Sequence, residues 1–324
     1  MSAAADVRGA AQITAAISGG DLRSAARLIT RIEAADEAAA PVLAQLYARG
    51  GSTPIVGLTG PPGAGKSTLV DQMLAQYRAA GERVAVLAVD PSSPFSGGAI
   101  LGDRVRMGRH NTDPGVFIRS MAARGRLGGL ALAAADALTV LDAMGWDRIL
   151  IETVGVGQNE IEILRHADTV IIVQTPAGGD AVQAVKAGIL EVGDLFVVNK
   201  ADTAGADRTV AALREAVEFR THALGAEAWQ PPVLKTEAAG GVGIRELLQA
   251  IDAHHQHFRD HPKQFAARRR SQARARLVEC MAAALRARRG DDEQHDIFDD
   301  TIDDVVARRC DPQTAAKRLV DSMS

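Results

Sequence analysis

A glycine-rich stretch holds the residues that point most directly to chemistry. Residues 60–67 read Gly-Pro-Pro-Gly-Ala-Gly-Lys-Ser, which fits the phosphate-binding pattern G-x-x-x-x-G-K-[ST] in full. Glycines let backbone N–H groups curve around a triphosphate, and the N-terminus of a following helix adds a positive dipole end. We therefore expect Lys66 to reach the β- and γ-phosphates and Ser67 to ligate Mg²⁺. The alternative is a coincidental glycine-rich turn.

The residues on both sides of this stretch predict the elements that must position it. The apolar run Ile55-Val56-Gly57-Leu58 before it is typical of a buried strand, and the apolar periodicity of residues 68–74 after it indicates a helix. Strand, glycine-rich loop and helix, in this order, form the context that the motif requires.

A second motif predicts which base accompanies the phosphates. Asn199-Lys-Ala-Asp202 ends the apolar run 195–199. We expect the Asp202 carboxylate to accept hydrogen bonds from guanine N1–H and the 2-amino group, two donors that adenine lacks at these positions. Sites built on hydrogen bonds reject such analogues strongly. Asn199 is expected to tie loops together and the Lys200 stem to cover the base, so the predicted nucleotides are GTP and GDP.

Two further apolar runs end in a carboxylate, at Asp90 and at Glu152. Carboxylate oxygens suit Mg²⁺, often through water, so we expect both residues in the metal shell; the alternative for Asp90 is a strand cap. The Gly155 N–H could meet the γ-phosphate and sense its hydrolysis. Asp103 stands in a loop rich in proline and glycine, where it could approach the nucleotide or act as a helix N-cap.

The composition bounds the class of protein. The chain has 324 residues, a net charge of −3, 47% hydrophobic residues and only 3% aromatic ones, so a large core must consist mainly of Ala, Val, Leu and Ile. The small negative net charge gives no reason to expect nucleic acid or a membrane as a partner. Cys280 and Cys310 are interpreted as reduced residues rather than a disulfide. The absence of a signal segment or a long apolar run predicts a cytoplasmic protein.

The order of elements predicts an α/β fold. Short apolar strands alternate with helices, which favours a mostly parallel sheet covered by helices on both faces. We expect a helical extension at 1–50, the phosphate-binding domain at 51–260, and a helical arm at 261–324 with a basic run and an acidic run. The charge runs of the arm have two interpretations, solvated helix faces or pairing with another chain. The expected strands lie near 55–59, 84–90, 115–120, 148–153, 169–174, 194–199 and 232–235.

The motifs together resemble the MeaB/ArgK/MMAA GTPases, of the SIMIBI class of P-loop NTPases. The resemblance rests on the phosphate loop and on Asp90-Pro-Ser-Ser-Pro, Gly97-Gly98, Leu101-Gly-Asp-Arg-Val-Arg-Met107, Glu152-Thr-Val-Gly-Val-Gly-Gln158 and Asn199-Lys-Ala-Asp202. It covers residues 20–260 well. It implies a GTP-hydrolysing chaperone that gates cobalamin loading and protects an adenosylcobalamin-dependent acyl-CoA mutase, usually methylmalonyl-CoA mutase. It also implies a homodimer joined through C-terminal helices.

The resemblance also implies roles for individual residues. The implied catalytic residues are Lys66, Glu152, Gly155 and Gln158. The implied Mg²⁺ ligands are Ser67, Asp90, Asp103 and Glu152. The implied nucleotide-binding residues are Gly60, Pro61, Pro62, Gly63, Ala64, Gly65, Lys66, Ser67, Thr68, Asn199, Lys200, Asp202, Thr236, Glu237 and Ala238. Glu237 departs from the pattern, because many relatives carry a small hydroxyl residue there.

Two other functions remain open at this stage. A metal-delivery GTPase of the same class would need clustered Cys and His ligands. The histidines at 254, 255, 257 and 261 form the only such cluster, and without a nearby Cys they are interpreted as a surface cluster at a helix end. A scaffold that binds GTP without useful turnover would carry the same motifs.

Overall fold

The computed structural model describes most of the chain. The described residues are 3–90, 108–110, 112–122, 129–153, 161–162, 164–176, 189–222 and 228–288, together with short stretches between 301 and 317. The chain forms two compact units, Met1–Ala267 and Arg268–Ser324. Three residues with expected roles, Asp103, Gly155 and Gln158, lie outside the described residues.

The first unit contains a seven-stranded sheet in the order β3-β2-β4-β1-β5-β6-β7, and every neighbouring pair is parallel. The predicted parallel sheet is therefore confirmed, with each strand within two residues of its expected position. The strands are β1 Ile55–Thr59, β2 Val84–Asp90, β3 Val116–Ala122, β4 Arg148–Thr153, β5 Thr169–Gln174, β6 Leu195–Asn199 and β7 Val233–Thr236.

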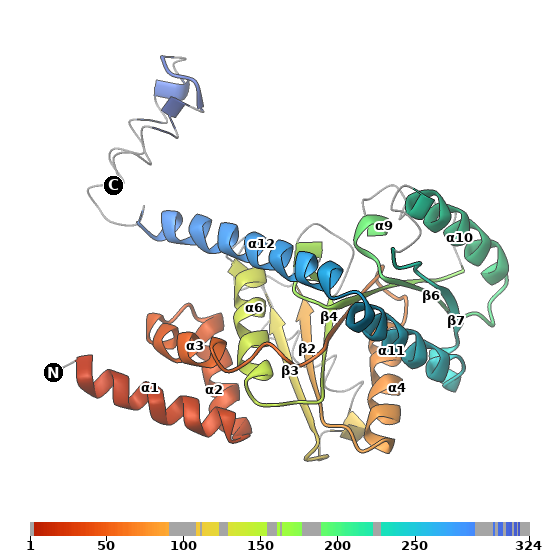
Figure 1. Cartoon of the computed structure of the whole chain (residues 1–324), viewed down its shortest axis with the longest axis horizontal. Helices are drawn as coiled ribbons and strands as arrows, with labels where there is room; N and C mark the ends of the chain where they lie inside the picture. The colour runs from red at the N-terminus through yellow and green to blue at the C-terminus, as the bar shows by residue number, and fades with distance from the viewer. Residues whose placement is uncertain are drawn as a thin grey trace. The chain divides into compact units, whose positions relative to one another are not determined.

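Helices surround the sheet (Figure 1). Three of these helices begin directly after a capping residue: Asp21 before α2, Gly65 before α4 and Gly243 before α11. The α-helices are α1 Ala3–Ser18, α2 Leu22–Glu33, α3 Ala40–Tyr47, α4 Lys66–Ala79, α6 Gly129–Asp142, α9 Ile189–Val192, α10 Ala206–His222, α11 Ile244–Asp260 and α12 Pro262–Arg288; the 3₁₀ turns are η1 Glu37–Ala39, η2 Gly108–His110 and η3 Ala238–Gly240.

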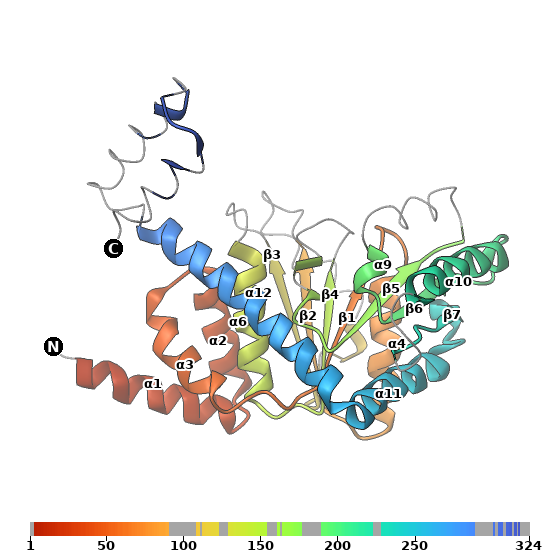
Figure 2. The same cartoon turned by 45° about the horizontal axis from the view of Figure 1, so that its top comes forward.

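Strand side chains alternate between two hydrophobic cores, one on each face of the sheet. On β2, Leu87 packs into the core shared with α1, α2, α3, α6 and α10, whereas its neighbour Val86 packs into the core shared with α4 and α11. This alternation follows from the period of two along a strand. Because helices lie over both faces of the sheet (Figure 2), the central strands β1, β5 and β6 are buried along their whole length.

The N-terminal helices cover one end of this sheet. Arg119 on the edge strand β3 forms an ion pair with Glu33 of α2, and its guanidinium donates to Thr30 Oγ1 at 3.1 Å. Buried residues of α2 and α3 join the same core as α6. The expected extension 1–50 thus packs on one face of the sheet within the first unit.

The expectation that the four histidines lie at the surface is wrong for His254. Its side chain is fully buried, with Nδ1 at 2.8 Å from Thr169 Oγ1 and its ring against Trp229 and Phe258. The cause is the helical period, which places His254 on the buried stripe of α11 with Leu247 and Ile251. Among the described residues, no group of three His, Cys, Asp or Glu side chains is placed to hold a metal ion.

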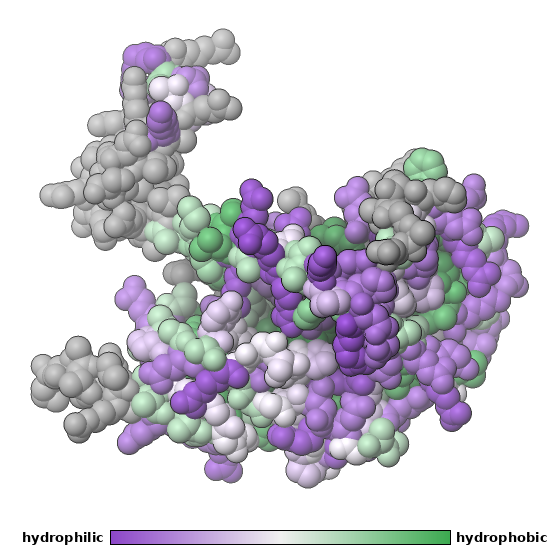
Figure 3. Space-filling view, in the orientation of Figure 1, coloured by the Kyte–Doolittle hydropathy of each residue, from purple (hydrophilic) through white to green (hydrophobic). Residues whose placement is uncertain are grey.

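The C-terminal arm begins with the long helix α12, which confirms the expected basic helical run. Leu277, Val278 and Met281 on this helix are 62%, 58% and 57% exposed. Apolar and charged side chains alternate over its surface in Figure 3. No helix within the described parts of the chain is long and apolar enough to cross a bilayer.

Candidate nucleotide-binding site

The expected site residues gather at one edge of the sheet. In a parallel sheet the carboxyl ends of all strands face the same way, and ligands bind beyond them. The glycine-rich loop follows β1 at the centre. The acidic residues Asp90 and Glu152 come from β2 and β4 on one side of β1, and Asn199 and Thr236 end β6 and β7 on the other side. The strand order therefore places the residues expected to hold a metal ion on one side of β1 and those expected to bind the base on the other side.

At two positions of the loop, the neighbouring atoms leave no room for a side chain. A Cβ atom on Gly60 would lie 2.1 Å from the Val173 carbonyl oxygen, and one on Gly65 would lie 2.4 Å from Asn199 Nδ2. Gly65 also has a φ of +86°, a conformation that side chains disfavour. The loop therefore packs closely against its neighbours, and α4 begins directly after Gly65, so the positive end of its helix dipole lies at the loop.

Lys66 lies inside the loop. Its residue is 6% exposed, and its Nζ donates to the Gly60 carbonyl at 2.7 Å and to the Pro61 carbonyl at 3.1 Å. Both acceptors belong to the loop, so the ammonium group is held at the position around which the loop curves. A positive charge there suits phosphate oxygens.

Ser67 and Glu152 meet next to this lysine. The Ser67 hydroxyl donates to Glu152 Oε1 at 2.7 Å, and the two residues are 7% and 2% exposed. Glu152 lies in register with Leu58 of β1 and Ala88 of β2, so its strand brings the carboxylate between the loop and the end of β2. A buried hydroxyl and carboxylate are hard oxygen donors of the kind that Mg²⁺ takes.

The Asn199 side chain joins three parts of the site. It is 2% exposed. Its amide donates to the Ala64 carbonyl at 2.8 Å, and its Oδ1 accepts from Thr236 Oγ1 and from the Ala238 N–H, both at 3.0 Å. The expectation that Asn199 ties loops together agrees with these contacts. The N–H group of Ala238 is therefore engaged in a hydrogen bond to the Asn199 side chain.

The turn after Asn199 has an unusual backbone. Lys200 has a φ of +59°, and the left-handed conformation costs an L-residue about 1–2 kcal/mol. The turn is held by the Ala201 N–H, which donates to the Thr236 carbonyl at 3.0 Å, and by the Thr203 N–H, which donates to the Lys200 carbonyl at 2.9 Å. Asp202 is exposed at this turn, so its carboxylate is accessible to a base.

A compact turn that the sequence reasoning missed supports the loop after β7. The Glu237 N–H donates to the Val242 carbonyl at 3.0 Å, and the Val242 N–H donates back at 3.2 Å. A Cβ on Gly243 would lie 2.2 Å from the Lys235 carbonyl. The glycines on both sides of Val242 were the available signal, because such spacing indicates a tight turn. Glu237 takes part in this turn through its backbone N–H and carbonyl, so the turn does not depend on its side chain.

The comparison with known proteins decides the family. The family described as "Methylmalonyl Co-A mutase-associated GTPase MeaB" matches residues 25–294. The chain belongs to the MeaB family of GTPases. The resemblance seen in the motifs is thereby confirmed, as are the P-loop fold and the assignment as a GTPase.

Individual relatives agree with this family. A Pyrococcus abyssi protein that is named as a GTPase is 45% identical to this chain, and the match covers 93% of each of the two chains. The mitochondrial methylmalonic aciduria type A homolog of Mus musculus is 40% identical, over 60% of this chain and 48% of that protein. A crystal structure titled LAO/AO transport system kinase has a TM-score of 0.71 and 26% identity, and the match covers 97% of each chain.

Proposed function

We propose that this MeaB-family chain binds GTP and Mg²⁺ at the carboxyl edge of its sheet and uses hydrolysis to gate cobalamin loading of an adenosylcobalamin-dependent acyl-CoA mutase, which it also protects. The observation that supports the nucleotide assignment is the Asn199 side chain, which joins the glycine-rich loop to the loop after β7. One buried side chain thus supports both the phosphate half and the base half of a site.

In this proposal different residues bind the phosphates, the base and the metal ion. The backbone of residues 60–65, Lys66 and Thr68 hold the phosphates, and Asp202 reads guanine beneath the Lys200 stem. Ser67, Asp90 and Glu152, with Asp103, would hold Mg²⁺, which when bound neutralises charge on the β- and γ-phosphates. Gly155 and Gln158 are proposed to position the attacking water and the γ-phosphate.

The proposed partner follows from the family and its relatives. The family description names methylmalonyl-CoA mutase, and the relative from Mus musculus is named for methylmalonic aciduria. Methylmalonyl-CoA mutase or a close relative is therefore the partner that we propose. We place this role in the cytoplasm, where cysteines such as Cys280 and Cys310 stay reduced.

The partner assignment is tested by mixing the chain with purified methylmalonyl-CoA mutase from the same cells. We expect the mutase to raise phosphate release from GTP, and cobalamin transfer to the empty mutase to differ between GTP, GDP and a non-hydrolysable GTP analogue. Serum albumin in place of the mutase is the control. Complex formation with no nucleotide effect would favour a scaffold. Turnover of GTP without any complex would reject the mutase and leave the GTPase intact.

We also propose a homodimer formed through α12. Leu277, Val278 and Met281 expose apolar surface at helical spacing. A Met281→Glu substitution should shift the chain from dimer to monomer in sedimentation at micromolar concentration, since burying an unpaired charge is costly. Ala283→Glu is the matched control, because the helical period puts Ala283 on the opposite side. A native chain that sediments as a monomer would reject the dimer.

A further inference from the structure

Asp202 and Glu237 follow two backbone segments that one hydrogen bond holds together. β6 and β7 end side by side, with Asn199 in register with Thr236. Beyond the ends of these strands, the Ala201 N–H donates to the Thr236 carbonyl at 3.0 Å. Asp202 and Glu237 are the next residues along these two segments. The two acidic residues therefore lie on adjacent turns at the same corner of the site.

The backbone of Glu237 is fixed by the turn that follows it. Its N–H donates to the Val242 carbonyl at 3.0 Å. Its carbonyl accepts from the Val242 N–H at 3.2 Å and from the Gly240 N–H at 3.0 Å. Both polar groups of this backbone are thus used within the protein, and the carboxylate is the group of Glu237 that remains for a ligand.

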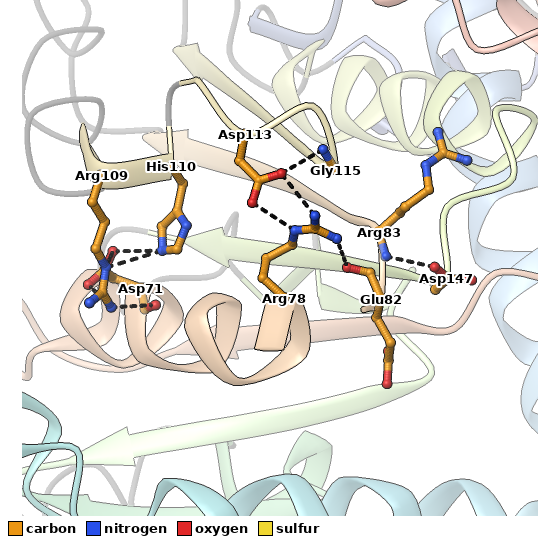
Figure 4. A network of polar contacts seen from close by, with 9 residues as sticks. All are labelled: Asp71, Arg78, Glu82, Arg83, Arg109, His110, Asp113, Gly115 and Asp147. Atoms are coloured by element: carbon orange, nitrogen blue, oxygen red, sulfur yellow. Dashed lines mark hydrogen bonds and ion pairs between the residues drawn. The ribbon is translucent and has the colours of Figure 1, made fainter. Parts of the chain in front are cut away.

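Two other carboxylates of the first unit show which donors a partly buried carboxylate takes (Figure 4). The Asp113 carboxylate accepts from Arg78 Nε and Nη2, both at 2.9 Å, and from the Gly115 N–H at 2.8 Å. The Asp71 carboxylate accepts from Arg109 Nε at 3.0 Å. In each case N–H groups of the protein replace the water that burial removes, which offsets the cost of burying a charge.

The carboxylates of Asp202 and Glu237 differ from these two. Glu237 is half-buried and Asp202 is exposed. Within the described parts of the chain, neither side chain has a hydrogen-bond or ion-pair partner. Two neighbouring carboxylates that both lack donors suit a ligand that brings several N–H groups of its own.

Guanine is such a ligand, because its edge carries one hydrogen on N1 and two on the 2-amino group. One carboxylate can accept two hydrogens side by side, which leaves the second hydrogen of the 2-amino group. We propose that Glu237 is a specificity-determining residue whose side chain accepts this hydrogen while Asp202 accepts the other two, a proposal that rests on the proposed binding of GTP. Inosine nucleotides keep N1–H but lack the 2-amino group, so the contact distinguishes guanine from hypoxanthine.

The test is a titration of the full chain with GDP and inosine diphosphate, each competing with a fluorescent guanine nucleotide. Glu237→Ala should weaken the binding of GDP about tenfold, in keeping with a partly exposed hydrogen bond to a charged group. It should leave the affinity for inosine diphosphate unchanged, because that base has no hydrogen for Glu237. Glu237→Gln keeps an acceptor oxygen and should retain part of the preference for GDP.

A matched control and the two affinities separate base recognition from a structural role. Glu246→Ala removes an exposed glutamate from the first turn of α11, with the same change of charge, and should alter neither affinity. Equal losses for GDP and inosine diphosphate in Glu237→Ala would show that the residue only supports the turn, and would overturn the proposal. An unchanged ratio of the two affinities would do the same while leaving GTP binding intact. A native chain that binds neither GDP nor GTP would reject the proposed function itself.

Discussion

The Asp202→Asn variant is expected to bind GTP about a hundredfold more weakly than the native chain and to prefer xanthosine triphosphate. In the native site two guanine donors face one carboxylate, and hydrogen bonds to a charged group contribute about 1.5–3 kcal/mol each. An amide offers one acceptor and turns a donor toward the guanine donors, whereas it can donate to the extra carbonyl of xanthine. Asp202 is exposed, so the fold should be unaffected.

Titration with fluorescent GTP, ATP and xanthosine triphosphate measures this change of preference. Asp207→Asn is the matched control, because Asp207 is an exposed aspartate of the next helix that pairs with Lys235. The control should bind GTP as the native chain does. Equal affinity of the native chain for ATP and GTP would show that Asp202 does not read the base.

The Lys66→Ala variant is expected to lose at least about a hundredfold in turnover of GTP, because a cation that stabilises a transferring phosphoryl group supplies several kcal/mol. The structure adds a second effect. The Lys66 ammonium bonds to the Gly60 and Pro61 carbonyls, so its removal also takes away a support of the loop. We therefore expect weaker binding of GTP as well as slower hydrolysis.

Phosphate release at saturating GTP and Mg²⁺ isolates the catalytic loss from the binding loss. Lys263→Ala, which removes an exposed lysine at the start of α12, should keep native turnover. Circular dichroism should show an intact fold in both variants. Native turnover in purified Lys66→Ala would place the phosphates elsewhere in the molecule.

Local patterns in the sequence were enough to predict the strands and the loop contacts. The runs ending at Asp90, Glu152 and Asn199 are apolar because both faces of the sheet are covered. Each strand can therefore be recognised in the sequence without knowledge of its neighbours in the sheet. The contacts of Asn199 were predictable for a similar reason. Its motif ends a strand, and in a parallel sheet the carboxyl end of that strand lies at the same edge as the glycine-rich loop.

Contacts between distant segments could not be predicted in this way. The pairing of Arg78 with Asp113 and of Arg119 with Glu33 depends on the strand order β3-β2-β4, which no local pattern encodes. His254 was misplaced because a polar residue on an amphipathic helix indicates a surface position. Its burial depends on Thr169, a partner 85 residues away in the chain.

The central place of β1 in the sheet has a consequence for synthesis on the ribosome. Ile55 of β1 pairs with Ile149 and Val56 pairs with Thr169, so the strand that precedes the phosphate loop emerges some 90 residues before either neighbour. At a rate of about 5–20 residues per second, its edges stay unpaired for roughly 5–20 s. Unpaired strand edges promote aggregation. The nascent chain therefore exposes both edges of β1 in this interval, before the strands that cover them have been made.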